Sequence, residues 1–272
     1  MPTPTTTTTA TSTASKLSNI PALDLPSLHR RQHPARPRFL VLVDPDGAMA
    51  AAIARPRAVL AFAFVCLWAL LPPAAFLVAA HQQGGLESVI VDEMKKSGAW
   101  EKISQLPAEK RAEVMRVTAP AMAIGLPVGA ASKRAGWLLF VSAGCFLLLR
   151  GTSSRPIRLG EVVAVVAVGA APLLVHDLLT AASYLSWELR SIDPQNAVAS
   201  NPANVLFSGA SSRSVVAVLL RGVDIFELWS CWLMGLGVAR LTSTRSLTPW
   251  LVTYGGHAAI TVFGALTSRV PS

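Results

Sequence analysis

The segment from Ala58 to Ala80 carries no charged side chain, and Arg57 and His81 bracket it. About 20 such residues are needed to cross the hydrocarbon core of a bilayer. A helix of this composition has no polar face that it could turn to water, so the segment predicts a transmembrane helix. Four further apolar stretches follow it. The sequence therefore predicts an all-α, polytopic integral membrane protein with five transmembrane helices.

The composition of the chain also favours a membrane protein over a soluble one. Only 14% of the 272 residues are charged and the mean hydropathy is +0.47, whereas soluble domains carry about 25% charged residues. The net charge of +9 resides in basic residues beside apolar segments, a pattern that predicts contact with anionic lipid headgroups rather than nucleic acid. Cys66, Cys145 and Cys231 lie singly in apolar stretches, so we expect buried thiols rather than disulfides or metal ligands.

The five predicted spans are residues 58–80, 131–149, 162–184, 215–238 and 247–267. In the first, Pro72 and Pro73 remove two backbone donors and predict a kink. In the second, Lys133 and Arg134 are expected at a membrane surface, because both are costly at mid-depth. In the fifth, Gly255 and the alanine four residues later predict a close helix contact.

The regions outside the spans have distinct compositions. Residues 1–38 are rich in Ser and Thr and predict a disordered cytoplasmic tail, or a start placed upstream of the true one. No apolar run begins near Met1, so we expect no cleavable secretory signal. Asp44-Pro45 predicts a helix start and Pro56 a helix end. Residues 81–118 have helical apolar spacing and predict an amphipathic extracytoplasmic connection on the membrane surface.

The orientation follows from the positions of Lys and Arg. The arginines before the first span, at positions 30, 31, 36, 38, 55 and 57, place the N-terminus in the cytoplasm. An odd number of spans then places the C-terminus outside. We expect the chain in a plasma (inner) membrane.

Three ionisable residues lie three apart near the start of the fourth predicted span: Arg221, Asp224 and Glu227. On one helix they share a face, and with His257 of the fifth span they could form a proton or cation path. The alternative is structural. Asp224 would then mark the outer end of the fourth helix, pair with Arg221 and cap the backbone.

Enzymatic signatures are missing from the sequence, which contains no HExxH, GxSxG, Walker glycine loop or dinucleotide fingerprint. His176-Asp177 could supply two metal ligands, but an exposed polar helix end explains the pair equally well. We therefore expect no catalytic residues, no cofactor and no metal.

The second half of the chain contains a recognisable pattern of residues. Asn201-Pro202-Ala203-Asn204 is followed by Val223-Asp224-Ile225-Phe226-Glu227-Leu228-Trp229 and then by Gly235-Leu236-Gly237. This pattern resembles the bacterial branch of the YIP family, five-helix membrane proteins named after eukaryotic Rab-GTPase-interacting members. The resemblance covers residues 39–267 and points to Asn201, Pro202, Phe226, Trp229, Gly235 and Gly237 as structural or functional positions, beside the three ionisable residues above.

The resemblance implies a membrane protein without a defined biochemical activity. The Rab role of the eukaryotic members is not carried across, because the chain lacks their Asp-Leu-Tyr-Gly-Pro-type segment. The expected function is non-enzymatic: organising the membrane or binding partner proteins by helix packing, with self-association as one mode. The alternative is a small transporter or channel that uses Arg221, Asp224, Glu227 and His257.

Overall fold

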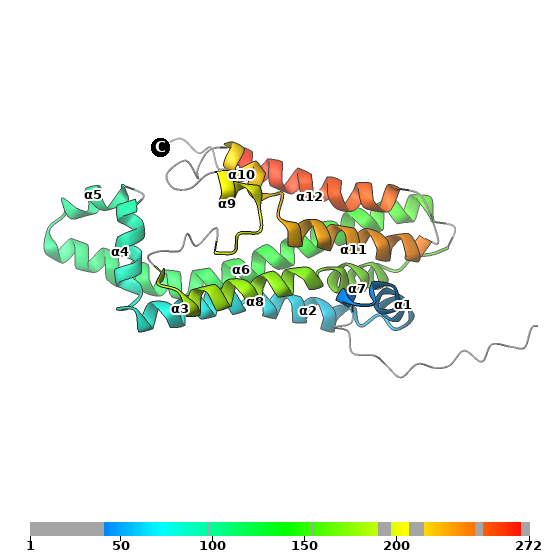
Figure 1. The fold of residues 1–272 in the computed structure, drawn as a ribbon, viewed down its shortest axis with the longest axis horizontal. Helices are drawn as coiled ribbons and strands as arrows, with labels where there is room; N and C mark the ends of the chain where they lie inside the picture. The colour runs from blue at the N-terminus through cyan, green and yellow to red at the C-terminus, as the bar shows by residue number, and fades with distance from the viewer. Residues whose placement is uncertain are drawn as a thin grey trace, which may run out of the picture. The chain divides into compact units, whose positions relative to one another are not determined.

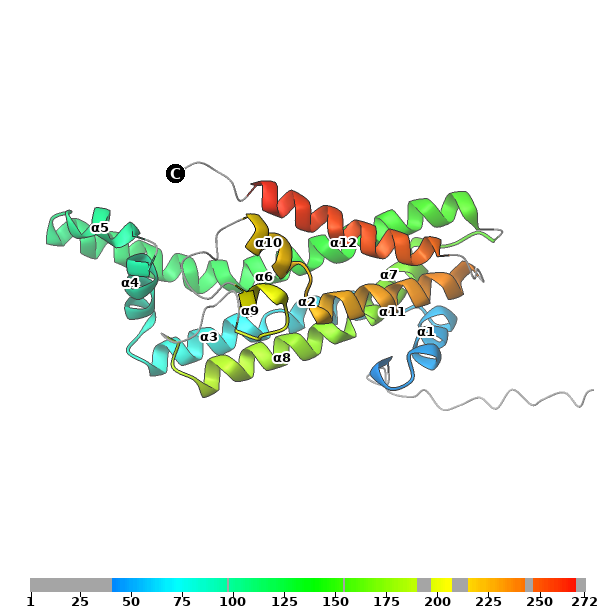
Figure 2. The same ribbon diagram turned by 45° about the horizontal axis from the view of Figure 1, so that its top comes forward.

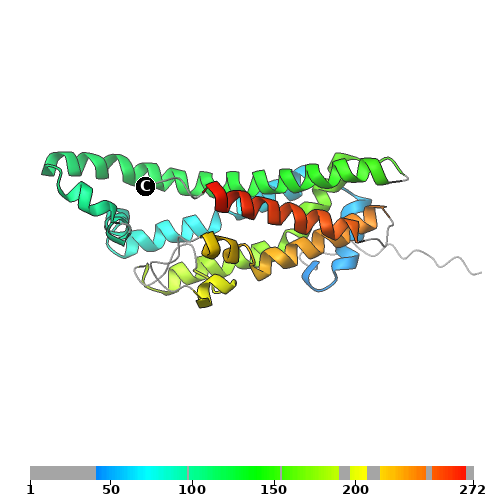
Figure 3. The ribbon, with the colours of Figure 1, turned by 90° about the horizontal axis from the view of Figure 1, so that it is seen from above.

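The computed structural model describes residues 41–96, 98–153, 155–189, 197–206, 215–242 and 247–267, and all regular structure in them is helical. The predicted all-α class is thereby confirmed for these ranges. The predicted tail, residues 1–38, lies outside the described residues. Figures 1, 2 and 3 show the helices from three directions, with α11 and α12 side by side and α3 beside α8.

The predicted juxtamembrane helix is present as α1 (Pro45–Ala54). Asp44 caps it, because its Oδ1 accepts a hydrogen bond from the Gly47 N–H at 2.9 Å. The helix packs on α7 and α11, with Met49 fully buried. Its Asp46 forms an ion pair with Arg240 at 2.6 Å. The helix is therefore part of the core of the membrane domain rather than a separate surface element.

The first predicted span is interrupted at its prolines, as expected. It consists of α2 (Ala58–Trp68) and α3 (Leu71–Gln82). Pro72 and Pro73 fall in the first turn of α3, where an N–H group has no carbonyl partner inside the helix. Their missing N–H groups therefore cost α3 no internal hydrogen bond. Trp68 joins this break to another helix, since its Nε1–H donates to the Leu174 carbonyl at 3.0 Å.

The connection and the second span lie on three helices, one of which extends well beyond the predicted span. The connection holds α4 (Leu86–Lys96) and α5 (Ala99–Ser104), and Pro107 precedes the start of α6 (Ala108–Thr152). This 45-residue helix runs through both the predicted surface segment and the predicted span at 131–149. Pro120 and Pro127 lie inside it without ending it. None of its residues from 108 to 137 is buried, so other elements cover this part of the helix only in part.

The third predicted span is a bent pair, α7 (Leu159–Gly169) and α8 (Ala171–Ser186), with 40° between them. Pro172 lacks the N–H that would reach the Val168 carbonyl, so the helix breaks just before it. The fourth predicted span is also broken, into α10 (Val215–Arg221) and α11 (Ile225–Thr242), with α9 (Pro202–Leu206) before them. The stretch predicted as the fifth span is one continuous helix, α12 (Thr248–Thr267).

Glycines allow the closest helix contacts. A Cβ on Gly235 would lie 2.5 Å from Cδ1 of Trp250, and one on Gly169 would lie 2.6 Å from Cγ of Met234. A Cβ on Gly237 would meet Val165 and Met49. These contacts join α7, α11, α12 and α1. A Cβ on Gly255 would meet nothing within 4 Å, so the close contact predicted for it is wrong within the described chain.

Two apolar clusters lie along the bundle. The larger joins α1, α2, α6, α7 and α11, and the smaller joins α3 and α8 through residues such as Phe76, Ala79, Ala181 and Tyr184. Cys145 and Cys231 are buried, as predicted, whereas Cys66 is half-buried, and all three are free thiols.

Length and hydropathy identify two helices of the described chain that could cross a membrane, Ala58–Gln82 and Ala108–Gly151. The bent pair α7–α8 makes a third if it is counted as one span. Two more helices, α11 and α12, have 18 and 20 residues. Glu227 and Arg240 lower the hydropathy of the former, and His257 lowers that of the latter.

Candidate functional site

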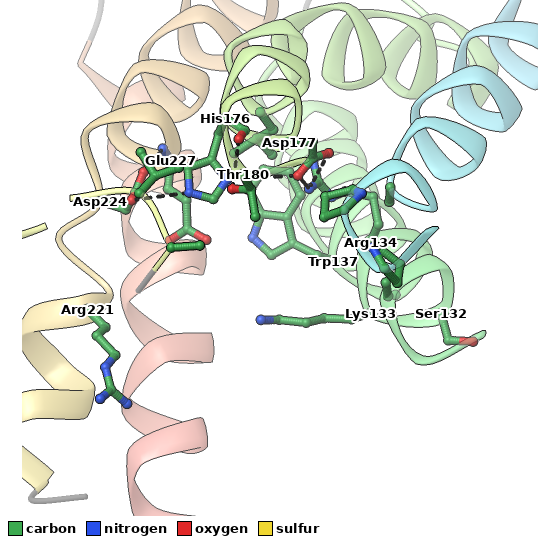
Figure 4. A pocket seen from close by; sticks show the side chains of 18 of the residues that line it. Ser132, Lys133, Arg134, Trp137, His176, Asp177, Thr180, Arg221, Asp224 and Glu227 are labelled. Carbon is green, nitrogen blue, oxygen red and sulfur yellow. Dashed lines mark hydrogen bonds and ion pairs between the residues drawn. The ribbon is translucent and has the colours of Figure 1, made fainter. Parts of the chain in front are cut away.

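A polar cavity of about 890 Å³ lies among the membrane helices. Pro72 of α3, Arg134 of α6, Asp177 of α8, Asp224 at the start of α11 and Ile260 of α12 all line it. Figure 4 shows the charged side chains of α6, α8, α10 and α11 gathered around this space. Residues that are more than 40 positions apart in the sequence therefore form one site.

A buried ion pair joins α6 to α8 at the cavity. Arg134 Nη2 donates to both carboxylate oxygens of Asp177 at 3.0 Å, and the two side chains are 15% and 7% exposed. The sequence predicted Arg134 at a membrane surface and His176-Asp177 at an exposed helix end. The second prediction is wrong, because Asp177 lies within α8 and is buried. The position of Arg134 at a membrane surface stays a prediction.

Asp224 is the N-cap of α11. Its Oδ1 accepts hydrogen bonds from the backbone N–H groups of Phe226 and Glu227 at 2.8 and 3.3 Å. Its Oδ2 accepts a hydrogen bond from the Ser200 hydroxyl and lies 4.0 Å from Nε2 of His176. The structural alternative predicted this capping role, and the geometry confirms it. The predicted single helix through Arg221 and Glu227 is wrong, since the cap starts a new helix.

Glu227 and His257 connect α11 to α12. His257 Nε2 lies 2.8 Å from the Gly222 carbonyl and 3.5 Å from the Glu227 carboxylate. A carbonyl only accepts hydrogen bonds, so Nε2 carries the proton. The other ring nitrogen, Nδ1, is buried and makes no hydrogen bond among the described residues. His257 thus holds the break between α10 and α11 against the last helix.

The cavity also holds two further basic residues. Arg221, at the end of α10, and Lys133, beside Arg134 on α6, both line it. Figure 4 shows the Lys133 side chain extending from α6 toward the side on which Arg221, Asp224 and Glu227 lie. The formal charges of the cavity balance, with three basic and three acidic side chains. His176 and Asp177 belong to no group of three metal-ligand side chains in the described chain.

The other predicted positions have diverse surroundings. Asn201 lines the cavity, and Pro202 begins α9. Phe226 packs edge-on against His176 with ring centroids 5.4 Å apart, whereas Trp229 is 36% exposed on α11. Gly235 and Gly237 are packing positions rather than cavity residues.

The sequence analysis did not identify Ser200 or Gly169. It identified Arg134 and Asp177 but did not predict that they pair. The signal for the pair was the presence of opposite charges in two apolar stretches. No local pattern marked the other two residues.

Charge also gathers at the opposite end of the bundle. Arg155 Nε donates to the Leu241 carbonyl at 3.1 Å and Nη1 contacts Glu161 at 3.3 Å, near Arg158 and Arg240. At 1.5 Å per residue, the cavity lies about 24 Å from this basic end along α6 and α11, and about 28 Å along α7–α8. A hydrocarbon core is about 30 Å thick, so one bilayer could separate the two charged levels.

Comparison with protein-family models matches residues 39–267 to the Yip1 domain. No curated protein and no solved structure matches the chain. The matched range is the range of the predicted resemblance, and it contains every residue of the cavity and every glycine contact described above. The chain therefore belongs to the Yip1 domain family of membrane proteins.

Proposed function

We propose that the chain crosses a bacterial plasma membrane five times, through α2–α3, α6, α7–α8, α11 and α12. The two charged levels support this placement, because each of the first four segments runs from the basic end to the cavity. At about 1.5 Å per residue, the 18 residues of α11 extend about 27 Å. Polar side chains near the two ends of each segment would then lie close to the two membrane surfaces.

The basic end faces the cytoplasm in this proposal, because Lys and Arg accumulate on the cytoplasmic side. Anionic headgroups would bind Arg150, Arg155, Arg158 and Arg240 there. A reporter that is active only outside the cell should be silent when fused at Met1 and active when fused after Ser272. Two fusions that place both ends of the chain on the same side would exclude an odd number of spans.

The proposed role is non-enzymatic, the organisation of the membrane or of partner proteins by helix packing. The observation that carries it is the apolar part of α6 beyond the cavity. Val117, Ile124 and Val128 are 63%, 68% and 57% exposed, and this stretch is not needed for crossing the bilayer. Uncovered apolar surface of this kind marks interaction sites.

A photo-crosslinking residue tests this role. Placed at Ile124 in native membranes, it should give discrete protein products, either a second copy of the chain or another protein. The same residue at Lys110, an exposed polar position of the same helix, is the matched control. Lipid adducts alone at Ile124 would contradict the partner-binding role.

The cavity supports a second candidate, a small transporter or channel. Its ionisable lining, with Glu227 38% exposed, resembles the polar sites that line transport paths in membranes. Purified protein in vesicles would then carry a proton or cation flux that Asp224→Asn or Glu227→Gln abolishes at unchanged abundance. Vesicles without flux favour the partner-binding role.

A further inference from the structure

Some donors of the charged side chains in the cavity make no hydrogen bond within the described chain. Asp177 is occupied by Arg134, and Asp224 by the start of α11. Lys133, by contrast, is exposed and makes no hydrogen bond or ion pair with a described residue. The second terminal nitrogen of Arg134, Nη1, is buried and also makes no hydrogen bond among the described residues. Neighbouring positions of α6 thus supply donors that an anion could engage.

A carboxylate belongs to the same site. Glu227 lies 3.5 Å from His257 on one side, but 38% of its side chain remains exposed. Lys133 and Arg134 line the same cavity as this carboxylate. A simple anion at Lys133 would be repelled by Glu227, whereas a ligand with both a phosphate and an amine would satisfy both groups.

Much of the remaining wall of the cavity is apolar. Pro73, Phe140, Leu173 and Ile260 line it together with the charged residues. The volume of about 890 Å³ falls within the range of about 300–1,000 Å³ that small-molecule sites occupy. An amphipathic ligand therefore suits the cavity better than a small hydrophilic one.

The level of the cavity also fits a lipid. At about 24–28 Å from the basic end, it lies where the hydrocarbon core meets the headgroups in the proposed placement. Phospholipid phosphates lie just outside that boundary, and acyl chains lie just inside it.

We propose that the cavity binds a phosphoethanolamine group, held as the headgroup of a membrane phospholipid. The phosphate accepts hydrogen bonds from Lys133 and from Arg134 Nη1, and the primary ammonium donates to the Glu227 carboxylate. The acyl chains leave along the apolar walls. This inference rests on the proposed membrane placement, but it does not depend on the partner-binding role.

Lipid binding to the purified full chain in detergent tests the assignment. Native mass spectrometry should show phosphatidylethanolamine bound about tenfold more tightly than phosphatidylcholine, whose quaternary amine cannot donate to Glu227. Phosphatidylglycerol, which has no amine, should also bind about tenfold more weakly. If free phosphoethanolamine competes as well as the lipid does, the ligand has the same chemistry but comes from a soluble source. If it does not compete, the ligand is the membrane lipid.

Three variants separate the contacts. Lys133→Gln should weaken all phospholipids about tenfold, and Glu227→Gln should remove the preference for the primary amine. Lys110→Gln, on the exposed polar start of α6, is the matched control and should change nothing. The thermal midpoint of each unliganded variant shows whether it has folded.

Equal binding of phosphatidylethanolamine and phosphatidylcholine to the unaltered chain would overturn the assignment. So would unchanged binding by a folded Lys133→Gln variant. The reporter fusions measure the membrane placement independently. If the unaltered chain shows no lipid selectivity while the fusions confirm the proposed topology, this inference alone is rejected.

Discussion

The Gly235→Ala substitution tests the helix packing on which the bundle depends. The added methyl group would lie 2.5 Å from Cδ1, 2.8 Å from Nε1 and 2.9 Å from Cγ of Trp250. Carbon atoms in good contact are about 3.5–4.0 Å apart, so the indole ring or one of the two helices must shift by about 1 Å. The indole is a rigid plane on the facing helix, so no single bond rotation relieves all three contacts.

The expected magnitude is a difference between two effects. Overpacking a well-packed contact costs about 1–3 kcal/mol. Replacing a glycine inside a helix by alanine returns about 1 kcal/mol of helix propensity. We therefore expect Gly235→Ala to lower the free energy of unfolding by up to about 2 kcal/mol. At about 2–4 °C per kcal/mol for a chain of this size, Tm should fall by up to about 8 °C.

Gly255→Ala is the matched control. Gly255 lies on α12, and nothing lies within 4 Å of its Cβ position, so only the propensity gain remains. Its Tm should stay the same or rise by a few degrees. The assay is thermal unfolding of the purified protein in detergent, followed by size-exclusion chromatography with fluorescence detection.

A second substitution at the facing tryptophan strengthens the test. Trp250→Leu in the Gly235→Ala background should recover part of the lost stability, because it removes the ring that the methyl group meets. The two changes would then be coupled in a double-mutant cycle. If Gly235→Ala is as stable as Gly255→Ala, the close approach of α11 and α12 is not what the structure describes.

Three further predictions concern the cap of α11, the Arg134–Asp177 pair and the packing of α4. Asp224→Asn keeps an acceptor at the start of α11 and should preserve abundance in membranes, whereas Asp224→Leu should destabilise by about 1–2 kcal/mol, measured by thermal unfolding. Arg134→Met should destabilise by about 3–5 kcal/mol, because it leaves a buried carboxylate unpaired. Adding Asp177→Leu should restore most of that loss, and no recovery in Tm would contradict the pairing. In cysteine-accessibility labelling, Ile90 should be protected and Glu93 labelled, since only the former is buried on α4; equal labelling would exclude the packed α4.

The breaks in the helices could be predicted in part from proline. Pro72 and Pro172 each lie just after a break, as the missing N–H requires. Pro120 and Pro127 have the same chemistry but lie inside α6. The surroundings differ, because no residue of α6 from 108 to 137 is buried, and surroundings cannot be read from a local pattern.

The break before α11 illustrates the same limit for polar residues. Asp224 was recognised as a cap from its place beside an apolar run, and its hydrogen bonds to Phe226 and Glu227 confirm it. The partner of Arg134 was not recognised, because an ion pair between side chains of α6 and α8 depends on how the whole bundle packs. Gly255 and Gly235 look alike in sequence, and only packing distinguishes them.

Stability alone does not explain the buried charges of the cavity. Removing a carboxylate and a guanidinium from water costs several kcal/mol for each ion, and an apolar pair of similar volume is often as stable. The apolar contacts of α7 and α11, from Val165 to Met234, show that this bundle packs well without ions. We therefore infer that the Arg134–Asp177 ion pair serves the binding of a ligand or partner. If Arg134→Met/Asp177→Leu folds as well as the unaltered chain yet binds all phospholipids more weakly, the pair serves binding rather than folding.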